Sequence, residues 1–383
     1  MSTDGVADVV VRARDLVPTL EANRAFAEEH ARLAPEVVNA CSEAGMFGLA
    51  APLDVGGVEA TLADIYEAHE IVASADPSAA WYMVNSMPLA RLAAFIEPRF
   101  WPDLYKTPLK NNGYSAVAGG RLTPAEGRDG YLLSGAWPLM TGVRDADWAM
   151  VLAVLREPDQ PPAALQTVIP TAQLEVTEIW HDAIGMRGTG SHQVATTDCF
   201  VPTGLAVGPL APPKIDRPLY RCAPFILPGA FNSAVPIGIL RAALQSAALA
   251  VKDKVSSIFG QSAASSSALL ELFADALLSA ELLSRGIKSA LDDVWRYAER
   301  DETPPAPLRA VVAGSPFHAA KIAREAISEI YSRSSSAAFF AGHPLERAMR
   351  DIHAVGYGVD TLRQLHHDTG RVAIGLAPLT PGF

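Results

Sequence analysis

The segment GMRGTGS, residues Gly185–Ser191, is the stretch on which the assignment of the fold depends. It alternates three glycines with an arginine and two hydroxyl side chains, and Val201-Pro202 follows ten residues later. Because glycine has no Cβ, the backbone here can approach a flat ligand closely. Hydroxyl and exposed N–H groups can then bind ring heteroatoms or phosphate oxygens. The segment is typical either of a Gly-rich turn or of a wall of a ligand site, and its neighbours along the chain distinguish the two.

Short strand-like runs surround this segment. Separated by Gly, Pro or Asp, they cover residues 131–135, 148–152, 165–169 and 193–196. Such spacing predicts a small β domain, which we place at residues 112–215. The proline-rich residues 209–218 are typical of a linker at its end.

Helical patterns flank the β domain on both sides. Residues 1–111 predict an N-terminal helical domain, in which Gly45 ends one helix and Asp76 caps another. Residues 216–383 predict a C-terminal helical bundle of about four helices, over 234–259, 265–297, 307–334 and a last stretch before Pro378. The fold class predicted is therefore α+β.

Composition narrows the classes of function. The 383 residues are 49% hydrophobic and only 19% charged, so we expect apolar surface to be buried in an extensive subunit interface. A net charge of −11 argues against binding nucleic acid. Cys41, Cys199 and Cys222 lie far apart and predict neither a metal site nor disulfides. With no signal-like start and no membrane-length apolar run, the sequence predicts a cytoplasmic protein without membrane contact.

This layout, together with local motifs, resembles the acyl-CoA dehydrogenase superfamily. Its N-terminal motifs are similar to residues 44–49 with Pro52 and Gly56-Gly57, and to residues 76–81. Residues 185–191, residues 137–142 with Asp147-Trp148, and residues 344–347 with 350–354 resemble its flavin-dependent monooxygenase branch, group D. The resemblance covers nearly the whole chain and implies an N-terminal helical domain, a β-barrel-like domain and a C-terminal four-helix bundle. It also implies a homo-oligomer, a tetramer or dimer.

The resemblance also implies a chemistry. A separate flavin reductase would supply reduced FMN or FAD. The reduced flavin would react with molecular oxygen to give a C4a-hydroperoxide, which would transfer one oxygen atom to a small apolar or aromatic substrate. The catalytic positions implied are Thr141, Ser191 and His192. The positions implied to bind the cofactor are Tyr114, Ser115, Trp137, Met140, Thr141, Arg187, Thr189, Ser191, Ser334, Ser335, Phe339 and Arg347. For most of these, ordinary structural roles remain open as alternatives.

The chain departs from the superfamily at several positions. Dehydrogenases need a carboxylate base, and Val359 stands where they carry glutamate, so acyl-CoA desaturation is not expected. Two histidines usual in the monooxygenase branch are replaced by Gly358 and Pro88. Ser256 stands where an arginine commonly meets the cofactor's phosphates. Two alternatives therefore stay open: a redox-neutral or other biosynthetic enzyme on this scaffold, and a catalytically silent homologue that binds a ligand.

Overall fold

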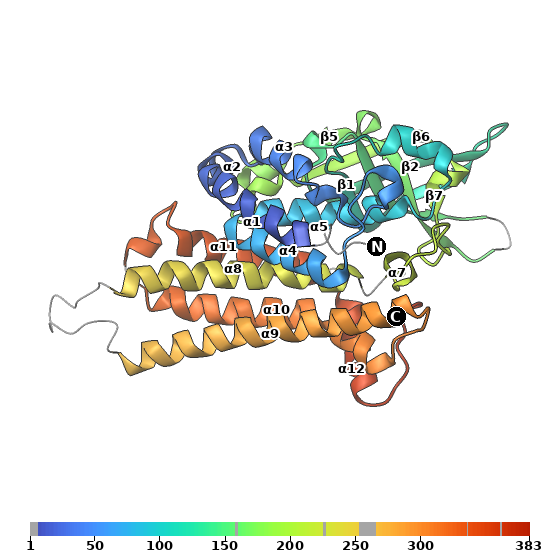
Figure 1. The fold of residues 1–383 in the computed structure, drawn as a ribbon. Helices are drawn as coiled ribbons and strands as arrows, with labels where there is room; N and C mark the ends of the chain where they lie inside the picture. The colour runs from blue at the N-terminus through green and yellow to red at the C-terminus, as the bar shows by residue number, and fades with distance from the viewer. Residues whose placement is uncertain (1–6, 158–159, 225–226, 253–265, 335, 361) are drawn as a thin grey trace. The chain divides into compact units, whose positions relative to one another are not determined.

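The computed structural model describes residues 7–157, 160–224, 227–252, 266–334, 336–360 and 362–383. Their elements form two compact units, drawn in Figure 1. The first comprises residues 1–61, 81–183 and 187–224, and the second comprises residues 62–80, 184–186 and 225–383. The division into domains 1–111, 112–215 and 216–383 stays a prediction.

A seven-stranded mixed sheet is the centre of the first unit. Its strand order is β5-β6-β2-β1-β3-β4-β7; β1 and β3 are parallel, and the other neighbouring pairs are antiparallel. The strands are β1 (Gly113–Pro124), β2 (Gly130–Met140), β3 (Trp148–Leu155), β4 (Ala163–Pro170), β5 (Glu175–Thr177), β6 (His192–Pro202) and β7 (Ala206–Val207). The four strand-like runs of the sequence thus coincide with β2, β3, β4 and β6.

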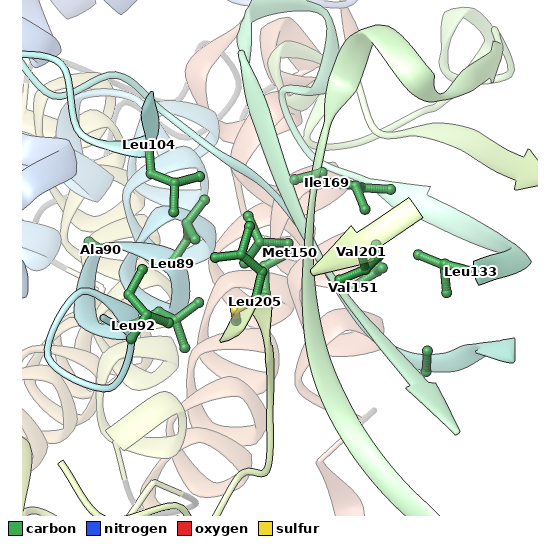
Figure 2. Close-up of a cluster of buried hydrophobic side chains, with 14 of the residues drawn as sticks. Leu89, Ala90, Leu92, Leu104, Leu133, Met150, Val151, Ile169, Val201 and Leu205 are labelled. Carbon is green, nitrogen blue, oxygen red and sulfur yellow. The ribbon is translucent and has the colours of Figure 1, made fainter. Parts of the chain in front are cut away.

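Helices complete the first unit. They are α1 (Ala7–Ala22), α2 (Arg24–His30), α3 (Pro35–Glu43), α5 (Pro77–Leu92) from residue 81 on, α6 (Trp101–Leu104) and α7 (Pro218–Arg221). Figure 2 shows Leu89 and Leu92 of α5 and Leu104 of α6 beside Met150 and Ile169 of the sheet. Burial of these large apolar side chains supplies the main stabilisation of the unit.

The second unit is helical. It contains α4 (Leu62–Ala75), α8 (Leu227–Lys252), α9 (Ser267–Glu299), α10 (Ala306–Ser332), α11 (Pro344–Asp360) and α12 (Arg363–Ala373). Small residues bring α4 and α8 close together, since a Cβ added at Gly238 would lie 2.5 Å from the Cβ of Ala73. The expected single helix before Pro378 is wrong: two helices, α11 and α12, occupy that stretch.

Two predicted helix ends are confirmed. Asp76 accepts hydrogen bonds from the N–H groups of Ser78 and Ala79 at 2.8 and 3.2 Å, as an N-cap residue does. Gly45 follows α3 with a φ of 75°, the left-handed conformation that glycine adopts at helix C-termini.

The most apolar helix is α8. By length and composition alone its residues 231–251 are sufficient to cross a membrane, and 50% of the most apolar window is buried within the protein. A core helix of a water-soluble protein meets the same criterion, so the observation is weak evidence for a membrane span.

Candidate functional site

Three buried hydroxyl groups form a hydrogen-bonded chain at the ends of two strands. Thr141 follows β2, Ser191 precedes β6, and Thr189 lies in the short 3₁₀ turn Arg187–Thr189. The Thr141 and Ser191 hydroxyl oxygens are 3.0 Å apart, and Ser191 donates to the Thr189 hydroxyl at 2.9 Å. Pairing of Met140 with His192 between β2 and β6 brings them together. The predicted residues Thr141, Thr189 and Ser191 therefore form one cluster.

The turn after Thr141 is fixed by glycine and by two neighbouring side chains. Gly142 has a φ of 64° and donates its N–H to the Thr189 carbonyl at 3.0 Å. The Asn111 amide donates to the Gly142 carbonyl at 3.0 Å. A Cβ at Gly142 would lie 2.7 Å from the ring of Tyr82 and 2.8 Å from the Asn111 amide. The backbone conformation and the available space therefore both require glycine, and the Thr141 hydroxyl is held in place.

Asn111 and Tyr82 are site residues that the sequence did not indicate. The Tyr82 hydroxyl donates to Asp145 at 3.0 Å, which ties the turn from the other side. Burial raises the pKa of Asp145, and the bond from Tyr82 partly opposes this. No spacing rule joins Asn111 to Gly142, so only the folded chain reveals the pair.

Arg187 binds three backbone carbonyls. Its Nε donates to Glu28 at 2.7 Å, and its Nη1 donates to His181 at 2.9 Å and Ala183 at 2.7 Å. The guanidinium thereby holds the 181–183 loop and the end of α2 to the signature segment. A role for Arg187 at the cofactor or the substrate mouth stays a prediction.

His192 lies in a cluster of charged and titratable groups. Its Nδ1 accepts the Ile179 N–H at 3.3 Å, and its ring centre is 5.8 Å from that of His181. Glu178 binds both Arg144, at 2.6 Å, and His181, at 3.1 Å. Burial lowers the pKa of His192, and this effect outweighs the nearby Glu178, so the neutral imidazole is favoured. None of the hydrogen bonds described for its ring reaches Thr141 or Ser191, and its catalytic role stays a prediction.

The other predicted residues of the first unit lie in or beside the sheet core. Trp137 and Met140 are fully buried, and the Trp137 indole N–H donates to the Leu152 carbonyl at 3.2 Å. Ser115 is buried beside a register shift between β1 and β3 and accepts the Val117 N–H at 3.4 Å. Burial raises the pKa of the Tyr114 phenol to about 12. Cofactor contact by these four residues stays a prediction.

The predicted residues of the C-terminal half belong to the second unit. The Ser334 hydroxyl donates to the Tyr331 carbonyl at 2.7 Å. Phe339 is exposed, with its ring edge-on to Tyr331 at 5.7 Å between ring centres. Arg347 lies half-buried in α11, and Ser335 falls outside the described residues. Their cofactor contacts stay predictions as well.

Positions where dehydrogenases or related oxygenases carry acid–base residues hold none here. Val359 is a buried apolar residue of α11, and Pro88 lies inside α5. The expected arginine position, Ser256, lies outside the described residues. Where the chain is described, no group of three or more His, Cys, Asp or Glu side chains is placed to hold a metal ion.

Known proteins with similar sequence or structure indicate the fold class of this chain. Residues 230–357 match the family model described as acyl-CoA dehydrogenase, C-terminal domain. The structure of XiaF from Streptomyces sp., in complex with FADH2 and glycerol, superposes with a TM-score of 0.87 at 22% identity, covering 98% of this chain and 97% of XiaF. The predicted α+β, acyl-CoA dehydrogenase-like fold is therefore confirmed.

Two further similarities give the branch. The oxygenase subunit HsaA, a flavin-dependent monooxygenase from Rhodococcus jostii, is 25% identical over 88% of this chain and 91% of its own length. TdsC from Paenibacillus sp. A11-2, solved with FMN and indole, superposes with a TM-score of 0.80 at 20% identity and covers 97% of this chain and 98% of TdsC. The predicted resemblance to the flavin-dependent monooxygenase branch is confirmed, and these relatives support a reduced-flavin monooxygenase function.

Proposed function

We propose that the protein is the oxygenase component of a two-component monooxygenase that uses reduced FMN or FAD. The buried chain of hydroxyls at Thr141, Ser191 and Thr189 is the observation that carries this proposal. The relatives bind or use flavins, and HsaA is named as an oxygenase subunit, which supports a separate reductase as partner.

The hydroxyl chain fits a reduced flavin. Ser191 donates its single proton to Thr189, so it accepts the proton of Thr141 in their mutual bond. The Thr141 oxygen then keeps lone-pair capacity for a ligand N–H, and a reduced flavin carries one N–H group, at N5, on its central ring. The backbone is fixed at Gly142 by Asn111, so the acceptor is preorganised.

When bound, the reduced flavin supplies the two electrons with which molecular oxygen gives one atom to the substrate and one to water. We propose that Thr141 holds the flavin through its hydroxyl oxygen and that Ser191 and Thr189 fix the direction of that hydroxyl. The apolar core beside them, with Trp137 and Met140 fully buried, keeps water away from this edge of the sheet.

We propose a small apolar or aromatic substrate that needs no deprotonation, because the histidines usual in the branch are Gly358 and Pro88 here. TdsC was solved with indole, which supports the aromatic class. The contacts of Tyr114, Ser115, Arg187, Ser334, Phe339 and Arg347 with the cofactor belong to the same proposal.

We further propose a homo-oligomer in the cytoplasm. Four leucines at helical spacing on α9 expose more than half of their surface, Leu270, Leu277, Leu278 and Leu282. A stripe of this kind is typical of a helix covered by another protein surface. Sedimentation velocity measures the oligomeric state directly. A monomer at micromolar concentration would contradict the proposed homo-oligomer.

The function is tested by anaerobic titration of the protein with reduced FMN and reduced FAD, followed by oxygen and a flavin reductase with candidate aromatic substrates. Saturable binding and oxygen-dependent product support the proposal. Absence of binding of either flavin contradicts it and favours the redox-neutral enzyme or the silent homologue.

A further inference from the structure

The first turns of α11 hold the start of the signature segment. Within the second unit, Arg350 donates through Nη1 to the Ile184 carbonyl, and Asp351 accepts the Met186 N–H at 2.6 Å. Arg350 is itself oriented by Glu346, one turn earlier, through a pair of hydrogen bonds. Two adjacent side chains of one helix therefore fix both ends of a three-residue segment.

The backbone at this place needs such support. Met186 has a φ of 51°, a conformation that side chains other than glycine, asparagine and aspartate rarely adopt. A Cβ at Gly185 would lie 2.3 Å from the Arg350 carbonyl oxygen, so the segment passes in close contact with α11. Asp351 is only 3% exposed, and it accepts the Met186 N–H at 2.6 Å. The carboxylate thereby stabilises an otherwise unfavourable conformation.

The backbone conformation at Met186 sets the direction in which the chain leaves this residue. Only Arg187 and Gly188 separate Met186 from Thr189, and Arg187 is bonded to three carbonyls in the first unit. Thr189 and Ser191 thus follow, within five residues of the chain, the backbone N–H that Asp351 holds.

We infer that Asp351 is a positioning residue for the proposed oxygenation: by holding the Met186 N–H it sets the place of the Thr189 and Ser191 hydroxyls. It acts through the backbone and not on the reacting atoms. The inference rests on the proposed function, but the fixing of the segment can be measured without it.

The chain offers a matched control in Asp368. This carboxylate is also fully buried on a helix of the second unit, and it also accepts backbone N–H groups, from Leu379 at 2.7 Å and Thr380 at 3.0 Å. Its partners lie in the C-terminal tail and not in the signature segment. Loss of either carboxylate removes a buried acceptor of backbone N–H groups; Asp368 also accepts bonds from the Thr380 hydroxyl and the Gln364 amide, so its loss is at least as demanding a control.

Amide hydrogen exchange measures directly how firmly Asp351 holds residues 184–186. We expect Asp351→Ala to accelerate exchange in peptides covering residues 184–191 about tenfold, because the Met186 N–H loses its acceptor. Asp351→Asn keeps one oxygen acceptor and should restore most of the protection. Asp368→Ala should leave these peptides unchanged and accelerate exchange at residues 379–380. Unchanged exchange in 184–191 for Asp351→Ala overturns the inference.

The yield of product per molecule of oxygen consumed then measures whether Asp351 positions the hydroxyl groups. At equal folded fraction, Asp351→Ala should lower the yield of product per oxygen consumed about tenfold, with a matching rise in hydrogen peroxide. Asp351→Asn should recover part of the yield, and Asp368→Ala should match the wild type. An equal loss of coupling in Asp351→Ala and Asp368→Ala overturns the positioning role. If the wild type binds no reduced flavin, the proposed function fails, and the exchange experiment alone still decides whether Asp351 fixes the segment.

Discussion

The hydroxyl chain of the first unit and a charged groove of the second unit show two different uses of buried polar groups. The groove, of about 560 Å³, lies between α4, α8 and α9 and is much the more conspicuous. Several of its charged groups, however, pair with one another. Arg241 binds both Glu70 and Glu281, Ser284 donates to the second oxygen of Glu70, and Lys288 pairs with Glu67.

The hydroxyl chain differs because it is not closed. The Thr141 hydroxyl oxygen can accept a further bond beside its bond with Ser191, whereas each oxygen of Glu70 already accepts a bond, one from Arg241 and one from Ser284. A ligand in the groove would have to displace ion pairs, at the cost of leaving charges without partners. Binding at the Thr141 hydroxyl displaces no ion pair, which is why we propose the flavin contact there and not in the larger groove.

Glu70→Ala should have the largest effect on stability. Glu70 is 8% exposed, and its loss removes the acceptor of the Ser284 hydroxyl and one of the two carboxylates that bind Arg241. We expect a loss of about 3 kcal/mol in the free energy of unfolding, measured by urea denaturation. Affinity for reduced flavin should not change at equal folded fraction. A loss of flavin affinity with little loss of stability would reverse the roles assigned to the two regions.

Gly142→Ala should come next. The φ of 64° disfavours alanine, and the new Cβ would meet the ring of Tyr82 at 2.7 Å. We expect about 2 kcal/mol of lost stability from strain and overpacking, together with weaker binding of reduced flavin as Thr141 moves. Gly127→Ala is the control, since Gly127 also has a positive φ, 67°, but has open space around it. Equal losses in both variants would show that space at Gly142 does not matter.

Thr141→Val separates the chemistry of the hydroxyl from its volume. Valine fills nearly the same space but removes the bond to Ser191 and the acceptor for the flavin. We expect about tenfold weaker binding of reduced flavin, equivalent to about 1.4 kcal/mol. Thr167→Val is the matched control, because Thr167 is also buried and donates to the Val151 carbonyl in the same sheet. Flavin affinity that is the same in both variants would remove Thr141 from the proposed site.

The sequence pointed to Thr189 and Ser191 through the local glycine-rich pattern, and to Thr141 through the resemblance to the monooxygenase branch. The glycine-rich segment and the hydroxyl side chains at strand ends can be read from the sequence, and the position of Asp76 before an apolar helix predicts that it caps this helix. The orientation of His192 was beyond reach. A register shift between β2 and β6 falls between Trp137 and Met140, and Met140 is the residue that pairs with His192. Alternation along the strand therefore does not tell which face the imidazole takes.

Supporting residues were also beyond reach, because tertiary packing selects them. Asn111 meets Gly142 across 31 residues of sequence and Asp351 meets Met186 across 165. Both supply a side chain to a backbone group, and any polar residue of suitable length has that capacity. The resemblance to a family likewise indicates which segments belong to the site, but it does not indicate that Asn111 meets Gly142 or that Asp351 meets Met186.

Asp368→Asn gives the smallest effect and tests whether saturated carboxylates of the second unit are purely structural. Burial alone would raise the pKa of Asp368, but hydrogen bonds from Leu379, Thr380 and Gln364 outweigh it and lower the pKa in the folded state. A carboxylate with a lowered folded pKa stabilises the fold above its unfolded pKa, and that stabilisation is lost as the pH falls through the folded pKa. We expect Asp368→Asn to cost about 1 kcal/mol near pH 7 and progressively less below about pH 4, where the unfolded carboxyl of the wild type becomes protonated. Thermal unfolding of both proteins across this range measures the difference, and a gap that widens towards acid would mean that the wild-type carboxyl is held in its neutral form.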